Sequence, residues 1–301
     1  MRPESEPADV PEVRIVDVEI VPAHTAPENI RALASITEFA EATMAAKEPG
    51  DADEGPVTPG PMLPTTSVAP EELALFGPDH LVPLGPPLPG RRDSKAAINS
   101  YWVAATGRSV GLPSLTQRHV VTELDFRGGL RTVVPRPMRI TADVDGTRLT
   151  VVPDLAVQLH DDPPTLLDVT TRPGRRHVLA AAVCREVGRL SGWQHRIRQP
   201  HSNPTVQANI DFLALYRRPL HVDPRVRREL LDRCGNDATI GSVLDGAGDR
   251  TLELPVLMHL IWHDVLDVDL DATLSNATRL RRGSDRSITP TWLPQLMAVA
   301  P

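Results

Sequence analysis

The 301-residue sequence has few of the features that mark a secreted, membrane or disulfide-stabilised protein. Its two cysteines, Cys184 and Cys234, form neither a CxxC pair nor a disulfide framework, which favours a reducing, cytoplasmic location. No run of about 18 apolar residues occurs, so neither a membrane span nor an export signal is expected. Only two lysines, Lys47 and Lys95, are present. No site built from residues 96–301 can therefore use the compact ammonium group of a lysine.

Acidic and basic side chains are unevenly distributed along the chain. Residues 1–90 carry 16 acidic and four basic side chains, whereas the rest carries 23 acidic and 28 basic ones. The first 90 residues also hold 16 of the 31 prolines, which lack a backbone donor and restrict φ. We therefore expect a mostly disordered acidic tail over 1–90, with a short strand in "VRIVDVEIV" and a helix in "APENIRALASITEFAEATMAAK" as exceptions. Such a tail either suppresses nonspecific nucleic-acid contacts or is a solvated linker.

Residues 91–222 show the alternating signals of a small α/β domain. A helix is predicted in "LPSLTQRHVVTELDF", with Leu115, His119, Thr122 and Phe126 on one side. Strand signals follow in "RTVVPRPMRI", "TRLTVVPDLAVQL" and "TLLDVTT". A helix in "RRHVLAAAVCREVGRLSG" ending at Gly192, a strand in "WQHRIRQ" and a helix in "PTVQANIDFLALYRRP" complete the pattern. This order predicts an α/β core with a mixed sheet flanked by helices.

The turn "HDDPP" determines which residues of the two adjacent strands face each other. If the strands pair across it, residues whose numbers sum to about 322 are opposite, which makes Asp154 and Asp168 neighbours. Asp168 and Thr170, two apart on one strand, point to the same face. Two adjacent carboxylates repel unless a divalent cation lies between them, and oxygen ligands suit Mg²⁺ or Mn²⁺ in phosphodiester hydrolysis. The alternative is that each aspartate only ends a strand.

Residues 223–285 have a different pattern, followed by a tail at 286–301. Three short helices are predicted in "DPRVRRELLDRCG", "TIGSVLDGAG" and "ELPVLMHLIWHD", followed by strand alternation in "VLDVDLDATL". Three helices and a hairpin are typical of a winged helix-turn-helix. The third helix has few basic residues, so docking to a protein partner is at least as well supported as reading DNA.

Taken in order, these segments resemble the TnsA-like endonuclease subunits of heteromeric transposases, which have a restriction-endonuclease-like PD-(D/E)xK fold. The matching landmarks extend over about 190 residues: "YWVAATGRSVG", "SLTQRHVVTELDF", "PRPMRI", "VVPDLAV", "LLDVTTRP", "LSGWQHRI", "ANIDFLALYRRP" and "LPVLMHLIWHDVLDVDL". The resemblance implies metal-dependent DNA cleavage at transposon ends. It also implies DNA, a D-D-E transposase subunit and an ATPase as partners, and a winged-helix accessory domain.

The resemblance assigns the active-site positions residue by residue and shows three departures. It implies Asp154 and Asp168 as metal ligands, with Mg²⁺ or Mn²⁺ as the ion. The family's helix glutamate falls on Gln117, its lysine on Thr170, and the glutamine of its Q-P pair on Arg136. A neutral hydroxyl cannot supply the charge with which lysine orients water and stabilises the transition state. Arg172, two residues after Thr170, is the candidate substitute.

Arginines near these positions are candidates for DNA contact because phosphate recognition needs charge rather than catalysis. Arg172, Arg175 and Arg176 lie beside the predicted site, and Arg217 and Arg218 end the last helix of the 91–222 domain. The alternative is that they are solvated surface arginines. Three hypotheses follow for the whole chain: a TnsA-like endonuclease with reduced activity, an inactive nuclease fold that binds DNA and a recombinase, and a winged-helix regulator.

Overall fold

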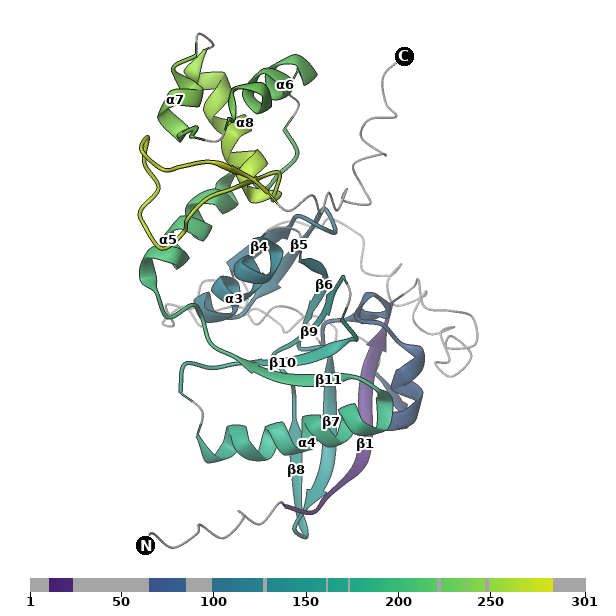
Figure 1. Ribbon diagram of the computed structural model, residues 1–301. Helices are drawn as coiled ribbons and strands as arrows, with labels where there is room; N and C mark the ends of the chain where they lie inside the picture. The colour runs from purple at the N-terminus through teal and green to yellow at the C-terminus, as the bar shows by residue number, and fades with distance from the viewer. Residues whose placement is uncertain are drawn as a thin grey trace, which may run out of the picture. The chain divides into compact units, whose positions relative to one another are not determined.

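The computed structural model describes residues 11–23, 65–84, 99–126, 129–160, 162–172, 174–220, 223–235, 237–246 and 249–283. The fold contains both helices and several sheets (Figure 1). The helix expected in "APENIRALASITEFAEATMAAK" and the tail at 286–301 lie outside the described residues. Within them, no helix is both long enough and apolar enough to cross a membrane.

The chain forms two compact units, each built from separate stretches of sequence. The first comprises Met1–Pro86, Val134–Val157 and Asp162–Ile197, and the second comprises Pro87–Val133, Gln158–Asp161 and Arg198–Pro301. Both units therefore combine segments that are distant in sequence.

The larger sheet of the first unit begins with the N-terminal strand. β1 (Val13–Pro22) lies between β2 (Thr66–Val68) and β7 (Met138–Val144), and β8 (Thr147–Val151) is next to β7. β3 (Leu81–Val82) also pairs with β1, and every one of these pairs is antiparallel. The strand predicted in "VRIVDVEIV" is confirmed.

Two stretches of the proline-rich first 90 residues therefore belong to a folded core, rather than to a separate tail. The 3-10 helices η1 (Pro70–Leu75) and η2 (Pro78–His80) each have proline at an initial position, where its missing donor costs no hydrogen bond. Leu73 and Phe76 are buried with the apolar residues of β1 and β7. Their apolar surface needs the sheet as a partner, which is why the segment folds.

One helix, α4 (Arg175–Ser191), contributes to the same core and packs near β1, β7, β10 and η1 (Figure 1). Val183, Cys184 and Val187 are fully buried on it. The helix ends at Gly192, whose φ of 76° is the left-handed C-cap that the sequence predicts. The indole Nε1 of Trp193 then donates to the carbonyl of Leu73 at 3.1 Å, which joins the end of α4 to η1.

A four-stranded sheet has the order β11-β10-β9-β6. Its strands are β6 (Leu130–Pro135), β9 (Leu155–Leu159), β10 (Thr165–Val169) and β11 (Gln194–Arg198). β9 and β10 are antiparallel, with Thr165 opposite Val157 and Leu167 opposite Leu155. These pairs have residue numbers that sum to 322, so the register predicted from the "HDDPP" turn is confirmed.

The second unit combines a hairpin, helices and a small sheet. Its strands are β4 (Asn99–Val103) with β5 (Arg108–Leu112), and β12 (Leu266–Asp267) with β13 (Arg281–Arg282). Its helices are α3 (Leu115–Asp125), α5 (Pro204–Leu213), η4 (Ala214–Tyr216), α6 (Pro224–Arg233), α7 (Ile240–Leu244) and α8 (Arg250–Trp262). Every helix that the sequence predicts in the described residues of the second unit is present.

The helices at 223–262 do not have a core of their own. Phe126 and the inner face of α5 pack in the same cluster as α6, α7 and α8. Asn209 of α5 donates from Nδ2 to the carbonyls of Leu270 and Ala272, both at 2.8 Å, and so binds the loop that follows β12. The strand expected through "VLDVDLDATL" therefore stops at Asp267, and the next residues form a loop held by α5.

The buried face of α3 matches the predicted one only in part. Thr122 and Phe126 are buried as predicted, but Leu115 is 53% exposed, and the buried face also includes Gln117, Val120, Val121 and Asp125. The Ser114 side chain caps the helix by accepting from the Gln117 N–H at 3.1 Å. Polar residues are tolerated inside because they find partners there, which apolar periodicity alone does not reveal.

Asp125 is the most deeply buried of these polar residues. Its Oδ2 accepts from the Tyr101 hydroxyl and the Ala104 N–H, each at 2.9 Å. Burial raises the pKa of the Asp125 carboxyl to about 6, although both hydrogen bonds and the charge of Arg217 favour ionisation. Because this folded-state pKa exceeds the ordinary value of 3.8, Asp125 stabilises the fold fully below pH 3.8 and loses that contribution as the pH rises through 6.

We expect Asp125→Asn to remove this pH dependence. The amide oxygen still accepts a hydrogen bond, and any cost of the new NH₂ group does not vary with pH. The difference in unfolding free energy, variant minus wild type, should therefore rise by up to about 3 kcal/mol between pH 4 and pH 7. Urea unfolding of both proteins at several pH values measures this difference, in which other titrating groups cancel. A constant difference would contradict the prediction.

Candidate functional site

The end of the β9–β10 hairpin brings together the two predicted metal ligands. Asp154 comes directly before β9, and Asp168 lies in β10. The last paired residues at this end of the hairpin are Leu155 and Leu167, and each aspartate is the neighbour of one of them in the sequence. The Asp154 Oδ2 accepts from the Val169 N–H at 2.8 Å, so its side chain reaches across to the strand that carries Asp168. The backbone of Asp154 is also held, since its carbonyl accepts from the Arg136 N–H at 2.8 Å.

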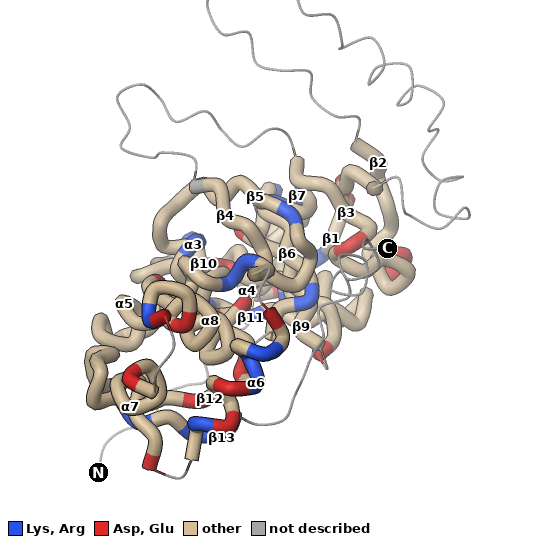
Figure 2. The backbone as a smooth tube through the Cα atoms, turned by 90° about the horizontal axis from the view of Figure 1, so that it is seen from above, with Lys and Arg blue, Asp and Glu red and all other residues tan. Residues whose placement is uncertain are grey.

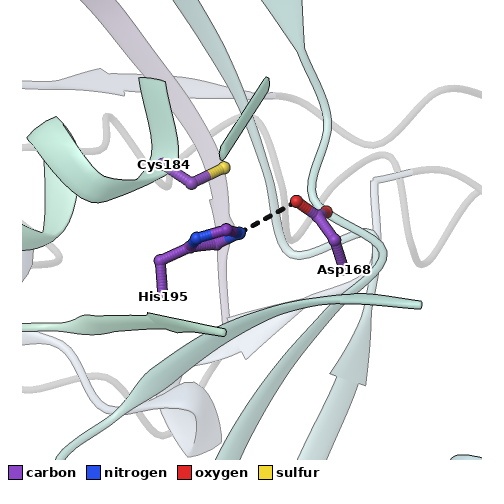
Figure 3. Close-up of side chains that lie close together, drawn as sticks. All are labelled: Asp168, Cys184 and His195. Atoms are coloured by element: carbon purple, nitrogen blue, oxygen red, sulfur yellow. Dashed lines mark hydrogen bonds and ion pairs between the residues drawn. The ribbon is translucent and has the colours of Figure 1, made fainter. Parts of the chain in front are cut away.

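Two further side chains complete this site, and the sequence did not indicate either. His195 of β11 bonds through Nε2 to the Asp168 Oδ2 at 2.9 Å, and Cys184 of α4 faces the same pair (Figure 3). One ligand atom from each of the three lies within 4.8 Å of the other two. Cys184 is 0% exposed, and the His195 and Asp168 side chains are 3% and 11% exposed. The site is therefore an inner cluster that has an oxygen, a nitrogen and a sulfur donor.

The Cys184 thiol lies in a buried environment near acidic side chains. Burial raises the pKa of the thiol far above its ordinary value, and the negative charges of Asp168 and Asp154 raise it further. A thiol in such surroundings stays protonated at neutral pH, and full burial prevents contact with a substrate. The Cys-His-Asp combination is thus not a nucleophilic triad, in which an accessible thiolate is required.

Local backbone geometry sets the position of β11 relative to α4. A Cβ added to Gly188 would lie 2.4 Å from the carbonyl oxygen of Trp193, so only glycine permits the chain to return this closely past the helix. His195 follows two residues after Trp193 and is thereby placed next to Cys184 and Asp168.

Thr170 and Arg172 lie just beyond β10, which ends at Val169. Thr170 is buried, and its Oγ1 accepts from the Arg172 N–H at 3.2 Å. The side chain of Arg172 is exposed. Because the strand has ended, alternation no longer applies, and the expectation that Arg172 returns to the face of Asp168 has no structural basis. Gln117 is a residue of the second unit, so the site described here consists of first-unit residues alone.

The arginines proposed for DNA contact fall into two groups. Arg172 and Arg176 are exposed, and the side chain of Arg175 lies outside the described part. Arg217 is partly buried and already engaged: its Nε donates to the Trp102 carbonyl at 2.8 Å, and its guanidinium lies over the Tyr101 ring. Burial lowers the pKa of Arg217. Its contacts therefore indicate a structural role within the second unit.

Arg218, by contrast, is exposed, with its guanidinium 5.8 Å from the centre of the Trp102 ring. It remains available for contact with phosphate.

His195 and Cys184 carried only weak signals in the sequence. Cys184 lies in an apolar stretch of a predicted helix, and His195 lies in a short predicted strand after the glycine that ends this helix. Neither position has a metal-binding spacing. A comparison with known proteins finds no family model and no curated protein that match this chain.

Proposed function

We propose that this chain is a TnsA-like subunit of a heteromeric transposase, with a metal-binding nuclease site whose power to cleave DNA at transposon ends is reduced. The observation that carries the proposal is the register of β9 and β10, which brings Asp154 and Asp168 to one end of the hairpin. The order of the sequence motifs, which resembles that of the TnsA-like subunits, supports the choice of family. The hairpin gives a reason why these two aspartates would act together.

The two carboxylates fit a divalent ion. The Asp154 carboxylate accepts from the N–H of Val169, the residue next to Asp168, and the Asp168 carboxylate is bonded to His195, so hydrogen bonds orient both side chains. An Mg²⁺ or Mn²⁺ ion bound there would activate water and stabilise the leaving oxygen. The chain itself would contribute the two ligands, oriented by their hydrogen bonds. It would not contribute the ammonium group, because Thr170 has only a hydroxyl.

The second unit has features suited to contacts with DNA or a partner protein. Arg225, Arg227 and Arg228 of α6 are exposed, as are Arg281 and Arg282 of β13, and basic residues colour both elements in Figure 2. The Arg282 guanidinium donates to the Leu231 carbonyl at 2.9 Å, which joins β13 to α6. These arginines support a phosphate-binding surface.

The arrangement around α7 supports a winged-helix relationship. Thr239, just before α7, forms a bridge with Arg279, and β12 pairs with β13. This places a short strand segment between the first two helices against the final hairpin, as in winged-helix domains. Most of α8, including Leu257, Ile261 and Trp262, is buried. A regulator that reads bases with this helix is therefore disfavoured, and docking to a transposase subunit is the better role.

An inactive nuclease fold that binds DNA and a partner is the second candidate. The observation that favours it is that Thr170 is buried and hydrogen-bonded within its own turn. Both lysines of the sequence, Lys47 and Lys95, precede the first helix of the nuclease-like region, so no lysine from the rest of that region can replace the one that the family has at position 170. The two candidates share the metal site and differ only in whether DNA is cut.

Calorimetric titration of Mn²⁺ into the full chain tests the shared site, and the full chain is needed because β1 pairs with β7. We expect Asp154→Asn and Asp168→Asn each to weaken binding by at least about 100-fold, because each removes a charged ligand. Asparagine retains an oxygen that can accept the Val169 N–H or His195 bond. Asp232→Ala, which removes an exposed carboxylate of α6, is the matched control.

Unchanged Mn²⁺ binding in both asparagine variants would overturn the proposed site. A nicking assay on supercoiled plasmid with Mn²⁺ then separates the two candidates. Weak nicking that both variants abolish identifies a nuclease. Metal and DNA binding without any nicking identifies the inactive form.

A further inference from the structure

We propose that Asp168, Cys184 and His195 form a site for a borderline-soft ion of the Zn²⁺ type, behind the Asp154–Asp168 pair. The proposal deepens the proposed function and rests on it only in sharing Asp168. Three elements supply one donor each: β10, α4 and β11 (Figure 3). Carboxylate oxygen, imidazole nitrogen and thiolate sulfur are the three kinds of donor that zinc accepts.

The distances allow a small contraction onto an ion. The His195 Nε2 and Asp168 Oδ2 are 2.9 Å apart. In a tetrahedral site with bonds of about 2.0–2.1 Å, nitrogen and oxygen ligands would be roughly 3.3 Å apart. The imidazole and carboxylate therefore need to separate by only a few tenths of an ångström, while the sulfur, within 4.8 Å of both, moves inward.

Charge gives a reason for the ion. Asp168 contributes a carboxylate to the cluster, Asp154 lies at the same end of the hairpin, and the sequence has no lysine after Lys95 that could balance these charges. A divalent cation would balance them, and a thiol that coordinates such an ion loses its proton. His195 is hydrogen-bonded to Asp168 and so has its ring already oriented toward the same point.

The donor set decides which ion is favoured. Mg²⁺ selects oxygen ligands, whereas thiolate and imidazole select zinc-like ions. The deep burial of the three side chains fits a closed position rather than an open catalytic one. The fourth ligand would be water or Asp154. An ion held here would fix the Asp168 carboxylate and thereby compete with Mn²⁺ for it.

Cobalt spectroscopy tests the site directly, because Co²⁺ bound to thiolate gives an intense near-ultraviolet charge-transfer band. Full-length protein, freed of any affinity tag and treated with chelator, is titrated with Co²⁺ both when folded and during refolding, since Cys184 is fully buried. We expect the band in the wild type and in Cys234→Ala, the matched cysteine control, but not in Cys184→Ala. Zinc displaces the cobalt and removes the band.

A second variant guards against misfolding. His195→Asn, checked by circular dichroism, is expected to weaken zinc binding by at least about 100-fold, since loss of even an outer partner of a metal ligand costs 10- to 100-fold. The proposal is overturned if wild type shows no thiolate band, if the band persists in Cys184→Ala, or if folded His195→Asn binds zinc normally.

Failure of this inference is distinguishable from failure of the proposed function. A Cys184-dependent band without nicking supports the zinc site and removes the nuclease. Mn²⁺-dependent nicking without a band leaves the nuclease and removes the zinc site.

Discussion

Thr170→Lys is expected to raise Mn²⁺-dependent nicking by about 100-fold, the low end of what a single well-placed charge-stabilising group contributes. The new ammonium group would follow Asp168 by two residues, where the family has its lysine. Two carboxylates nearby, Asp154 and Asp168, would stabilise the ammonium and offset the cost of its burial. Loss of the bond between Thr170 Oγ1 and the Arg172 N–H is a minor cost, because that bond is neutral and long.

Thr171→Lys is the matched control, since Thr171 is the adjacent residue and is exposed. It adds the same charge to the same turn without placing it at the family's position. Equal gains in the two variants would show that added charge merely improves DNA affinity. No gain in Thr170→Lys would count against an endonuclease ancestry for this site.

Arg233→Met is expected to destabilise the second unit by about 3–5 kcal/mol, the usual cost of leaving one member of a buried ion pair alone. The Arg233 guanidinium donates to both oxygens of Glu253, at 2.5 and 3.2 Å, and to the Val243 carbonyl at 2.6 Å. The Glu253 side chain is only 5% exposed, so the variant would leave a carboxylate in an apolar cluster. Chemical denaturation monitored by tryptophan fluorescence measures the loss.

A double variant separates charge from packing. Arg233→Met with Glu253→Leu removes both charges, and we expect it to be much more stable than Arg233→Met alone. Arg189→Met is the control, because Arg189 also makes two bonds to one carboxylate, that of Glu186, but is largely exposed. A comparable loss in the Arg189 variant would mean that burial is not the cause.

Sequence reasoning was sufficient where the determinants were local. The β9–β10 register follows from one turn, and the end of α4 follows from the glycine at position 192. The same register explains why Asp154 lies at the end of the hairpin beside the strand that carries Asp168. The alternation of side chains along a strand does not place Arg172 on the face of Asp168, because β10 ends at Val169 and side chains alternate between two faces only within a strand.

The remaining features depend on contacts between distant segments. Nothing near Leu73 indicates that its carbonyl will accept from Trp193, and this contact helps to fix the start of β11. The cluster of Asp168, Cys184 and His195 arises because α4 and β11 return to β10, which no spacing motif records. Composition also misled: proline-rich segments were expected to lack structure, yet those at 65–84 begin short helices and bury apolar residues.

The pairing of β1 with β7 has a consequence for biosynthesis. Glu19 meets Arg139, 120 residues later, so the first strand leaves the ribosome long before its partner exists. At about 5–20 residues per second, the wait is on the order of 6–25 s. During that time a largely apolar strand is exposed to other nascent chains, and the charged side chains of Arg14, Asp17 and Glu19 oppose such association. Slow translation would therefore lower the yield of folded protein, and a holding chaperone would raise it.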